Sequence, residues 1–173
     1  MKQFMHDLLL VAKKDLRIEI RSRVIINQVV PFAILVLVLF GFALDADQKT
    51  LRTFSPGLFW IAVLLSLLLA IQRSVSLETA HDSLTGLKLA GLSPVAIFFG
   101  KSIAIFTQIV FLELLLTGGI IIFYGAVIED PALWVVAGLV TALAVSVTGT
   151  LYGALASGLE VRETLLPILL LPV

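Results

Sequence analysis

The sequence predicts an all-α polytopic membrane protein, because its composition and the distribution of its apolar residues both suit a bilayer. Of 173 residues, 60% are hydrophobic and 14% are charged, whereas soluble domains are about 45–50% apolar and about 25% charged. The mean hydropathy is +1.11. The apolar residues form long runs, and a helix needs about 20 of them to cross a bilayer. We therefore expect a single transmembrane domain over residues 1–173.

Four apolar runs are long enough, or nearly so, to be transmembrane helices: 24–44, 56–71, 102–128 and 133–159. The second is short, and we expect Pro56 in its first turn, where the N–H that a proline lacks would be unbonded anyway. Arg73 would extend its charged head to the interface at the other end. A fifth run, 165–173, is too short to cross, so we expect the chain to end at the start of a fifth helix.

Residues 1–23 are expected to form an amphipathic helix on the membrane surface. Lys13, Arg17 and Arg21 recur every four residues and so form a row on one helix face. Lys14 and Arg23 add to the positive charge. Beside the row runs an apolar stripe of Met5, Leu9, Ala12, Leu16 and Ile20. Such a helix lies in the interface before the chain turns into the bilayer.

Two further features of this helix concern its contacts. A second apolar line, Phe4, Val11 and Ile18, predicts contact with the rest of the protein. Glu19 is spaced to pair with Arg23 one turn later. An interfacial anchor with no other task is the simpler interpretation.

The segment 73–101 is too polar for the membrane core yet repeatedly apolar. We expect a short helix over 76–84 with Ser76 as its N-cap, and Gly91 and Pro94 should end any regular structure after it. Connections of this length in compact proteins are usually functional, although a solvated connector is the alternative. If the segment docks a partner, the coupling side chains would be Glu78, Asp82, Leu84, Leu87, Leu89 and Leu92.

Positive charge favours a cytoplasmic N-terminus, since Lys and Arg accumulate in cytoplasmic segments. Of the 12 Lys and Arg residues, only Lys49 and Arg52 fall on the side opposite the N-terminus. Trp60 and Trp134 fall near that opposite end of their helices, where an indole suits the headgroup region.

Glu113 is an ionisable residue near the middle of the third run, a costly position that usually serves function or a polar contact. Thr117 follows one turn later on the same face. Both interpretations of Glu113 remain open. The fourth run carries small residues that permit close helix packing within the chain or in a dimer; they are Gly138, Ala142, Ser146, Gly149, Gly153 and Ser157.

No pattern in the sequence indicates catalysis, nucleotide binding or a metal site. Gly100-Lys101-Ser102 resembles the end of a phosphate-binding loop, but Val95 stands where that loop has glycine. Leu155 replaces the glycine that a nucleophile turn at Ser157 would need. A lone His81 is more typical of a surface residue than of a metal or haem ligand. Cysteine is absent and the net charge is zero, so neither thiol chemistry nor nucleic acid is expected.

Four segments together resemble the B subunit of the cytochrome c maturation haem exporter, the CcmB family. They are KKDLRIEIRSR from Lys13, PGLFWIAVLLSLLLAIQRSVSLE from Pro56, FFGKSIAIFTQIVFLELLL from Phe98 and GLEVRETLLPILLLPV from Gly158. The similarity covers nearly the whole chain. It implies an ABC-2-like permease of the bacterial inner membrane with six helices per chain, two copies, and a separate cytoplasmic ATPase.

In that family the membrane subunit works with a haem-handling membrane protein to load a periplasmic haem chaperone and to release it with haem bound. The resemblance therefore implies a chain without catalytic residues, with haem as candidate cargo and ATP hydrolysed by a partner. This sequence has no tryptophan-rich haem-binding segment. A generic ABC-2-type exporter of lipid or polysaccharide and a non-transporting membrane scaffold are the alternatives.

Overall fold

The computed structural model describes residues 2–44, 47–81 and 92–156. Most of these residues are helical and none of them forms a strand. The elements are α1 (Lys2–Ser22), the π-helix η1 (Ile25–Val29), α2 (Val30–Ala43), α3 (Gln48–His81), α5 (Pro94–Tyr124) and α6 (Pro131–Ala156). Four stretches are long and apolar enough to cross a membrane: Ile25–Ala43, Gln48–Ala70, Pro94–Tyr124 and Pro131–Gly153. The prediction of an all-α polytopic membrane protein is confirmed. The predicted start of a fifth helix, 165–173, lies outside the described residues.

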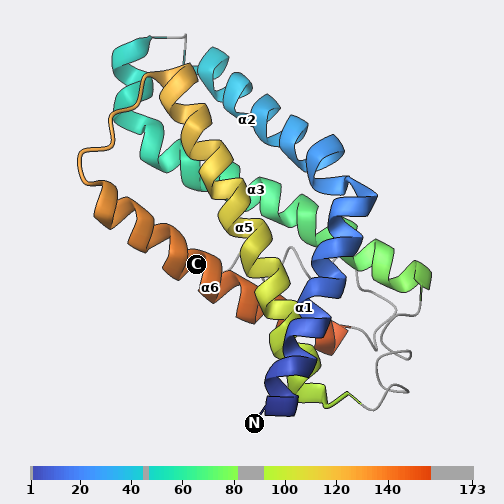
Figure 1. Ribbon diagram of the computed structural model, residues 1–173. Coiled ribbons are helices and arrows are strands. Elements are labelled where there is room, and N and C mark those ends of the chain that lie inside the picture. The colour runs from blue at the N-terminus through green and yellow to red at the C-terminus, as the bar shows by residue number, and fades with distance from the viewer. Residues whose placement is uncertain (1, 45–46, 82–91, 157–173) are drawn as a thin grey trace.

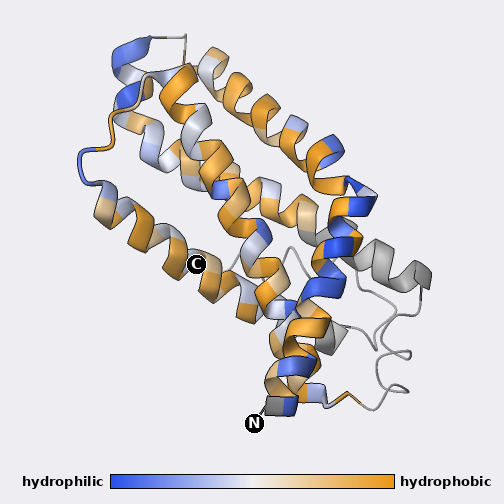
Figure 2. Ribbon diagram, in the orientation of Figure 1, coloured by the Kyte–Doolittle hydropathy of each residue, from blue (hydrophilic) through white to orange (hydrophobic). Residues whose placement is uncertain are grey.

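The four spans form an elongated bundle (Figure 1). α1, which begins at the N-terminus, runs at a steep angle to α2, α3 and α6. It lies beside the first turns of α5, at the lower end of that helix in the view. Apolar residues dominate the spans, whereas polar residues gather on α1 and near the helix ends (Figure 2).

A sharp corner separates α1 from the first span. Arg23 has a positive φ of 54°, a conformation that residues other than glycine and asparagine rarely adopt. Pro31 lies in the first turn of α2 and has no N–H for the carbonyl of Asn27, four residues earlier. The wider π turn of η1 accommodates this missing bond. The chain therefore changes direction near Val24, where the first apolar stretch begins.

Glu19 lies inside this corner and does not form the expected pair with Arg23. It is only 8% exposed, and its Oε1 accepts a hydrogen bond from the Ile25 N–H at 3.3 Å. Burial raises the pKa of the Glu19 carboxyl, and the bond from Ile25 opposes that shift. The prediction was wrong because the i, i+4 rule applies within one helix, and Arg23 has already left α1.

The second span begins at Gln48, so the expected start at Pro56 is wrong. A proline inside a helix leaves the carbonyl four residues earlier without its N–H donor. That carbonyl belongs to Arg52, and the Ser55 hydroxyl donates to it at 2.9 Å. The helix continues through Pro56 because its neighbour replaces the missing hydrogen bond.

Asp47 caps the extended N-terminus of α3. Its Oδ2 accepts hydrogen bonds from the Thr50 hydroxyl (2.6 Å) and the Thr50 N–H (2.9 Å), and these bonds lower the pKa of Asp47. The first turns of α3 cover the end of α5: Arg52 Nη2 is 3.2 Å from where a Cβ on Gly125 would stand. Gly125 ends α5 with a positive φ of 61°, which a glycine adopts without strain.

Helices replace most of the expected loop over 73–101. α3 continues to His81, so Ser76 lies inside a helix and is not an N-cap. α5 begins at Pro94, and the Ser93 hydroxyl caps it by accepting from the Ala96 N–H at 3.2 Å. The third span therefore begins before residue 102 and ends at Tyr124 rather than at residue 128. The predicted start was wrong because polar residues here continue the helix instead of breaking it, and the predicted end was wrong because Gly125 terminates α5 in the left-handed conformation.

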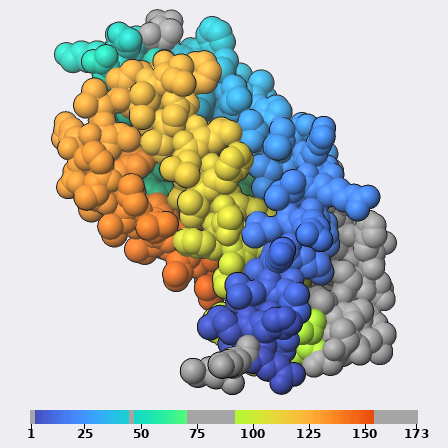
Figure 3. All heavy atoms as spheres, in the orientation of Figure 1, coloured from blue at the N-terminus to red at the C-terminus, as the bar shows by residue number. Residues whose placement is uncertain are grey.

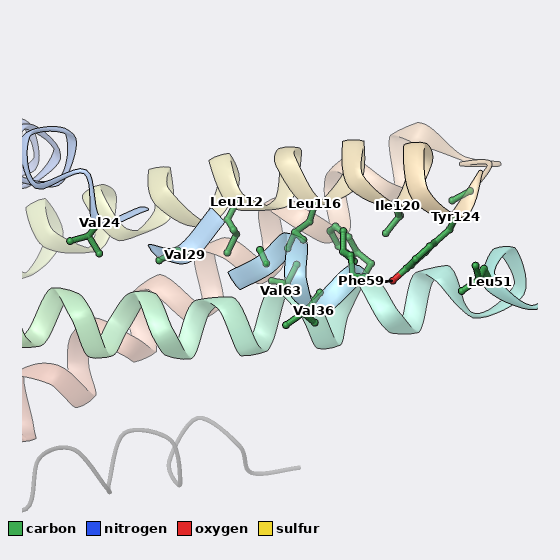
Figure 4. Packing of buried hydrophobic residues seen from close by; sticks show 14 residues of the cluster. Val24, Val29, Val36, Leu51, Phe59, Val63, Leu112, Leu116, Ile120 and Tyr124 are labelled. Carbon is green, nitrogen blue, oxygen red and sulfur yellow. Dashed lines mark hydrogen bonds between the residues drawn. The ribbon is translucent and has the colours of Figure 1, made fainter. Parts of the chain in front are cut away.

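The main apolar core joins α2, α3 and α5 (Figure 4). Gly119 allows α2 to approach α5 closely, since a Cβ there would stand 2.5 Å from Leu37 Cδ1. At the end of α5, the buried Tyr124 hydroxyl donates to the Leu37 carbonyl at 2.7 Å. α6 begins at Pro131, slightly before the predicted residue 133, where Asp130 Oδ1 accepts from two N–H groups of its first turn.

Candidate functional site: a buried carboxylate between three spans

Glu113 is buried in the apolar span of α5. It is only 7% exposed, and no described group donates a hydrogen bond to its Oε1. A carboxyl oxygen that has lost water without gaining a donor is costly, and more so within a bilayer. No described residue therefore supplies the contact to Oε1 that would explain Glu113 as a structural residue.

Gly138 of α6 makes room for the Glu113 carboxylate. A Cβ at Gly138 would stand 2.9 Å from Glu113 Oε2, which is too close for any larger residue without movement of the carboxylate. Gly138, one of the small residues predicted along α6, must therefore stay small because the Glu113 carboxyl group packs against it.

An aromatic layer covers the site on the side of the Tyr124 end of α5. The Thr117 hydroxyl donates to the Glu113 carbonyl at 2.7 Å and accepts from Trp134 Nε1–H at 3.2 Å. The Trp134 ring centroid lies 4.8 Å from that of Phe59 on α3. Thr117 follows Glu113 by one turn, as predicted, but its hydroxyl bonds to the backbone carbonyl of Glu113 and not to the carboxylate.

An aliphatic layer closes the site on the side of α1. Leu67, Ile109 and Ala142 form one buried cluster; Ile109 precedes Glu113 by one turn, and Ala142 follows Gly138 by one turn. The carboxylate therefore lies between an aromatic and an aliphatic layer, each built from α3, α5 and α6. The sequence indicated Glu113 and the small residues facing it. It gave no signal that Trp134, predicted at the membrane interface, would also bond to Thr117.

The arrangement offers one hydrogen-bond acceptor in an apolar surrounding. In the described part of the chain, no group of three His, Asp or Glu side chains could hold a metal ion. The chemistry available to Glu113 is to accept a hydrogen bond or a proton.

The remaining small residues of α6 differ in their surroundings. Ala142 and Ser146 are fully buried and Gly149 is buried. No described atom lies within 4 Å of the Cβ position of Gly153, and Ser157 lies beyond the described range. The packing roles of Gly149, Gly153 and Ser157 stay predictions.

α1 packs against the first turns of α5 (Figure 3). The two helices cross at Gly100, the glycine of the Gly100-Lys101-Ser102 motif. A Cβ on Gly100 would stand 2.6 Å from Val11 Cβ and 2.8 Å from the Leu8 carbonyl oxygen. Val11 is 1% exposed, which confirms the predicted contact for this residue, whereas Ile18 is 45% exposed and does not follow it. The motif lies within α5 and serves as a helix crossing.

The charged residues of α1 point away from that crossing. Lys13, Arg17, Arg21 and Arg23 are exposed, and Lys14 Nζ pairs with Asp15 Oδ1 at 3.0 Å. They remain the predicted contacts of an interfacial helix.

Most of the predicted coupling residues lie outside the residues that the structure describes. Glu78 lies on the last turns of α3, and Leu92 is half-buried just before α5. Asp82, Leu84, Leu87 and Leu89 are outside the described ranges. Their role stays a prediction.

Comparison with known proteins shows to which family the chain is similar. The family model described as CcmB protein matches residues 6–173. Heme exporter protein B of Haemophilus influenzae is 34% identical over 110 residues, covering 50% of each chain. The protein of the same name from Escherichia coli K12 is 30% identical over 94 residues, covering 54% of this chain and 43% of the relative.

A third relative extends the similarity along the chain. Heme exporter protein B of Rhodobacter capsulatus is 29% identical over 163 residues, covering 92% of this chain and 73% of the relative. The present chain spans half or less of the length of the first two relatives. No solved structure matches it. With a family match that runs from residue 6 to residue 173, the chain belongs to the CcmB family.

Proposed function

We propose that this chain is the transmembrane subunit of an ATP-driven complex in cytochrome c maturation. It would couple ATP hydrolysis by a partner chain to haem delivery, or to release of a haem-loaded periplasmic chaperone. The observation that carries this proposal is the family match over residues 6–173. The four apolar helices and the relatives named Heme exporter protein B support it. Its partners would be a cytoplasmic ABC ATPase, a second copy of this chain, a haem-handling membrane protein and the chaperone.

The proposed orientation places α1 on the cytoplasmic face of the bacterial inner membrane. Lys and Arg gather on α1 and on the adjoining helix ends, whereas Lys49 and Arg52 are at the opposite end of the bundle. This asymmetry is the one that orients membrane proteins during insertion.

Single cysteines test this orientation, because the chain has none of its own. A cysteine at Ser83 should react with an impermeant thiol reagent only when the cytoplasmic face is open, and one at Gln48 should react from the periplasm. Labelling of both positions in intact cells would contradict the proposed orientation.

The proposed mechanism transmits force through two helices. α3 continues past the end of its apolar stretch, Ala70, to His81, so it extends beyond the span toward the segment 82–91. α1 is fixed to α5 at Gly100. An ATPase that closes on ATP and pushes on both elements would rotate α3 and α5 as rigid bodies.

Glu113 lies on one of the helices that would move. Rotation of α5 against α6 changes what faces its carboxylate, because Gly138 provides space and no donor. We propose that Glu113 takes a hydrogen-bond donor in one state of the cycle and lacks it in the other.

Docking of the ATPase tests the proposed function. We expect Leu84→Asp or Leu87→Asp to lower the ATPase recovered with the tagged chain after detergent extraction by well over tenfold. A fully buried anchor contributes roughly 1.5–3 kcal/mol, and an unpaired carboxylate adds a desolvation cost. Lys49→Asp at the opposite end is the control and should leave recovery unchanged. Unchanged recovery for both leucine variants would make a membrane scaffold the better account.

A further inference from the structure

A groove of about 820 Å³ runs along α1 and ends at α5. Its apolar wall includes Leu9, Leu16 and Ile20 from α1 and Ile103 from α5. Leu9 is 56% exposed and Ile20 is 73% exposed, so these side chains are not part of the docking contact of Leu8 and Val11. The groove is therefore an exposed apolar surface of α1.

The rim of the groove is cationic. His6, Lys13 and Arg17 line it together with the apolar residues, and no aspartate or glutamate does. Lys13 and Arg17 are exposed. Within the described ranges, Lys14 pairs with Asp15 and His6 Nδ1 lies 3.6 Å from Asp7 Oδ1, so neither Lys13 nor Arg17 has a carboxylate partner there.

In the proposed orientation the groove runs from the membrane surface toward its interior. Ile103 belongs to the stretch of α5 that is apolar enough to cross a membrane and is 39% exposed, so it would face acyl chains there. α1 precedes the first span and runs at a steep angle to α2, α3 and α6 (Figure 1). Cations at the level of the headgroups therefore stand directly beside an apolar path into the bilayer.

We propose that this groove binds one anionic phospholipid. Its phosphate would lie between Lys13 and Arg17, one turn apart on the same face, and an acyl chain would follow Leu16 and Ile20 toward Ile103. Charge complementarity selects an anionic headgroup, because basic side chains attract anionic lipids at a membrane surface. Continuity with the lipid-facing side of α5 selects a lipid over a soluble anion. The bound lipid adds a second attachment of α1 to α5, next to the crossing at Gly100.

Native mass spectrometry of the full chain tests this site. The chain is extracted in mild detergent and mixed with equal amounts of phosphatidylglycerol and phosphatidylcholine. We expect one tightly retained phosphatidylglycerol, and the double variant Lys13→Gln/Arg17→Gln should lower its retention by roughly tenfold or more, as expected for two basic contacts to an anionic lipid. Ile103→Trp, which fills the end of the groove without changing charge, should also lower retention.

A charge-matched control separates a site from general attraction. Lys14→Gln/Lys49→Gln removes the same total charge from residues that do not line the groove, and it should retain the lipid like the wild type. Equal loss in both double variants would overturn the proposal in favour of nonspecific surface charge. Displacement of the lipid by inorganic phosphate would likewise overturn it, because the site would then recognise a free anion. Unchanged retention in Lys13→Gln/Arg17→Gln would show that the groove is not the site.

Discussion

Gly100→Leu is expected to detach α1 from α5. The added side chain would begin 2.6 Å from Val11 Cβ and 2.8 Å from the Leu8 carbonyl oxygen, and a backbone oxygen cannot turn aside as a flexible side chain can. Overpacking of this kind costs about 1–3 kcal/mol, a factor of roughly 5–150 in an equilibrium. The measurement is the labelling rate of a single cysteine at Val11, which is 1% exposed in the wild type.

Gly118→Leu is the matched control for this substitution. Gly118 is also inside α5, but no atom of the described chain stands within 4 Å of its Cβ position. The control should leave the Val11 cysteine protected. If Gly100→Leu also left it protected, α1 would not be held by this crossing, and α1 could not transmit force to α5 in the proposed way.

Glu113→Met is expected to stabilise the isolated chain and to abolish most of its activity. Methionine has a similar length and no polar atom that needs a donor, so it removes the cost of the unpartnered Oε1, about 1–3 kcal/mol for a buried polar group. The same change removes the acceptor that the proposed cycle uses. Thermal unfolding in detergent measures the first effect, and the yield of c-type cytochrome in a host lacking its own subunit measures the second.

Glu113→Gln is the companion variant, because it keeps an acceptor at this position but cannot gain or lose a proton as a carboxyl group can. It should retain more cytochrome yield than Glu113→Met. If Glu113→Met lowered stability and yield together, Glu113 would be a structural residue with a partner in the assembled complex. Full yield from Glu113→Met would remove any functional role.

Within the described residues, the sequence predicted the four apolar spans and their approximate places because apolar length determines which helices can cross a bilayer. It misplaced the ends for local reasons. Pro56 was expected at a helix start, but hydrogen bonding of Ser55 to the Arg52 carbonyl keeps α3 continuous. Glu19 was expected to pair with Arg23, but the left-handed turn at Arg23 sends the carboxylate to the Ile25 N–H.

The candidate site was only half predictable. Glu113 could be found because a carboxylate in an apolar run is costly wherever its helix packs. Its surroundings could not, because the contacts of Gly138 and Trp134 depend on how α6 is aligned with α5. For the same reason Gly100 looked like part of a nucleotide motif, and only the position of α1 shows it to be a helix crossing.

Release of haem-loaded chaperone is the measurement that tests the central claim most directly. Membranes would contain this chain, the haem-handling membrane protein, the periplasmic chaperone and either an active ATPase partner or one unable to hydrolyse ATP. The haem bound to released chaperone is then quantified with and without this chain. The proposed function predicts release only when this chain and ATP hydrolysis are both present. Equal release with the inactive ATPase would contradict an ATP-driven role for this chain.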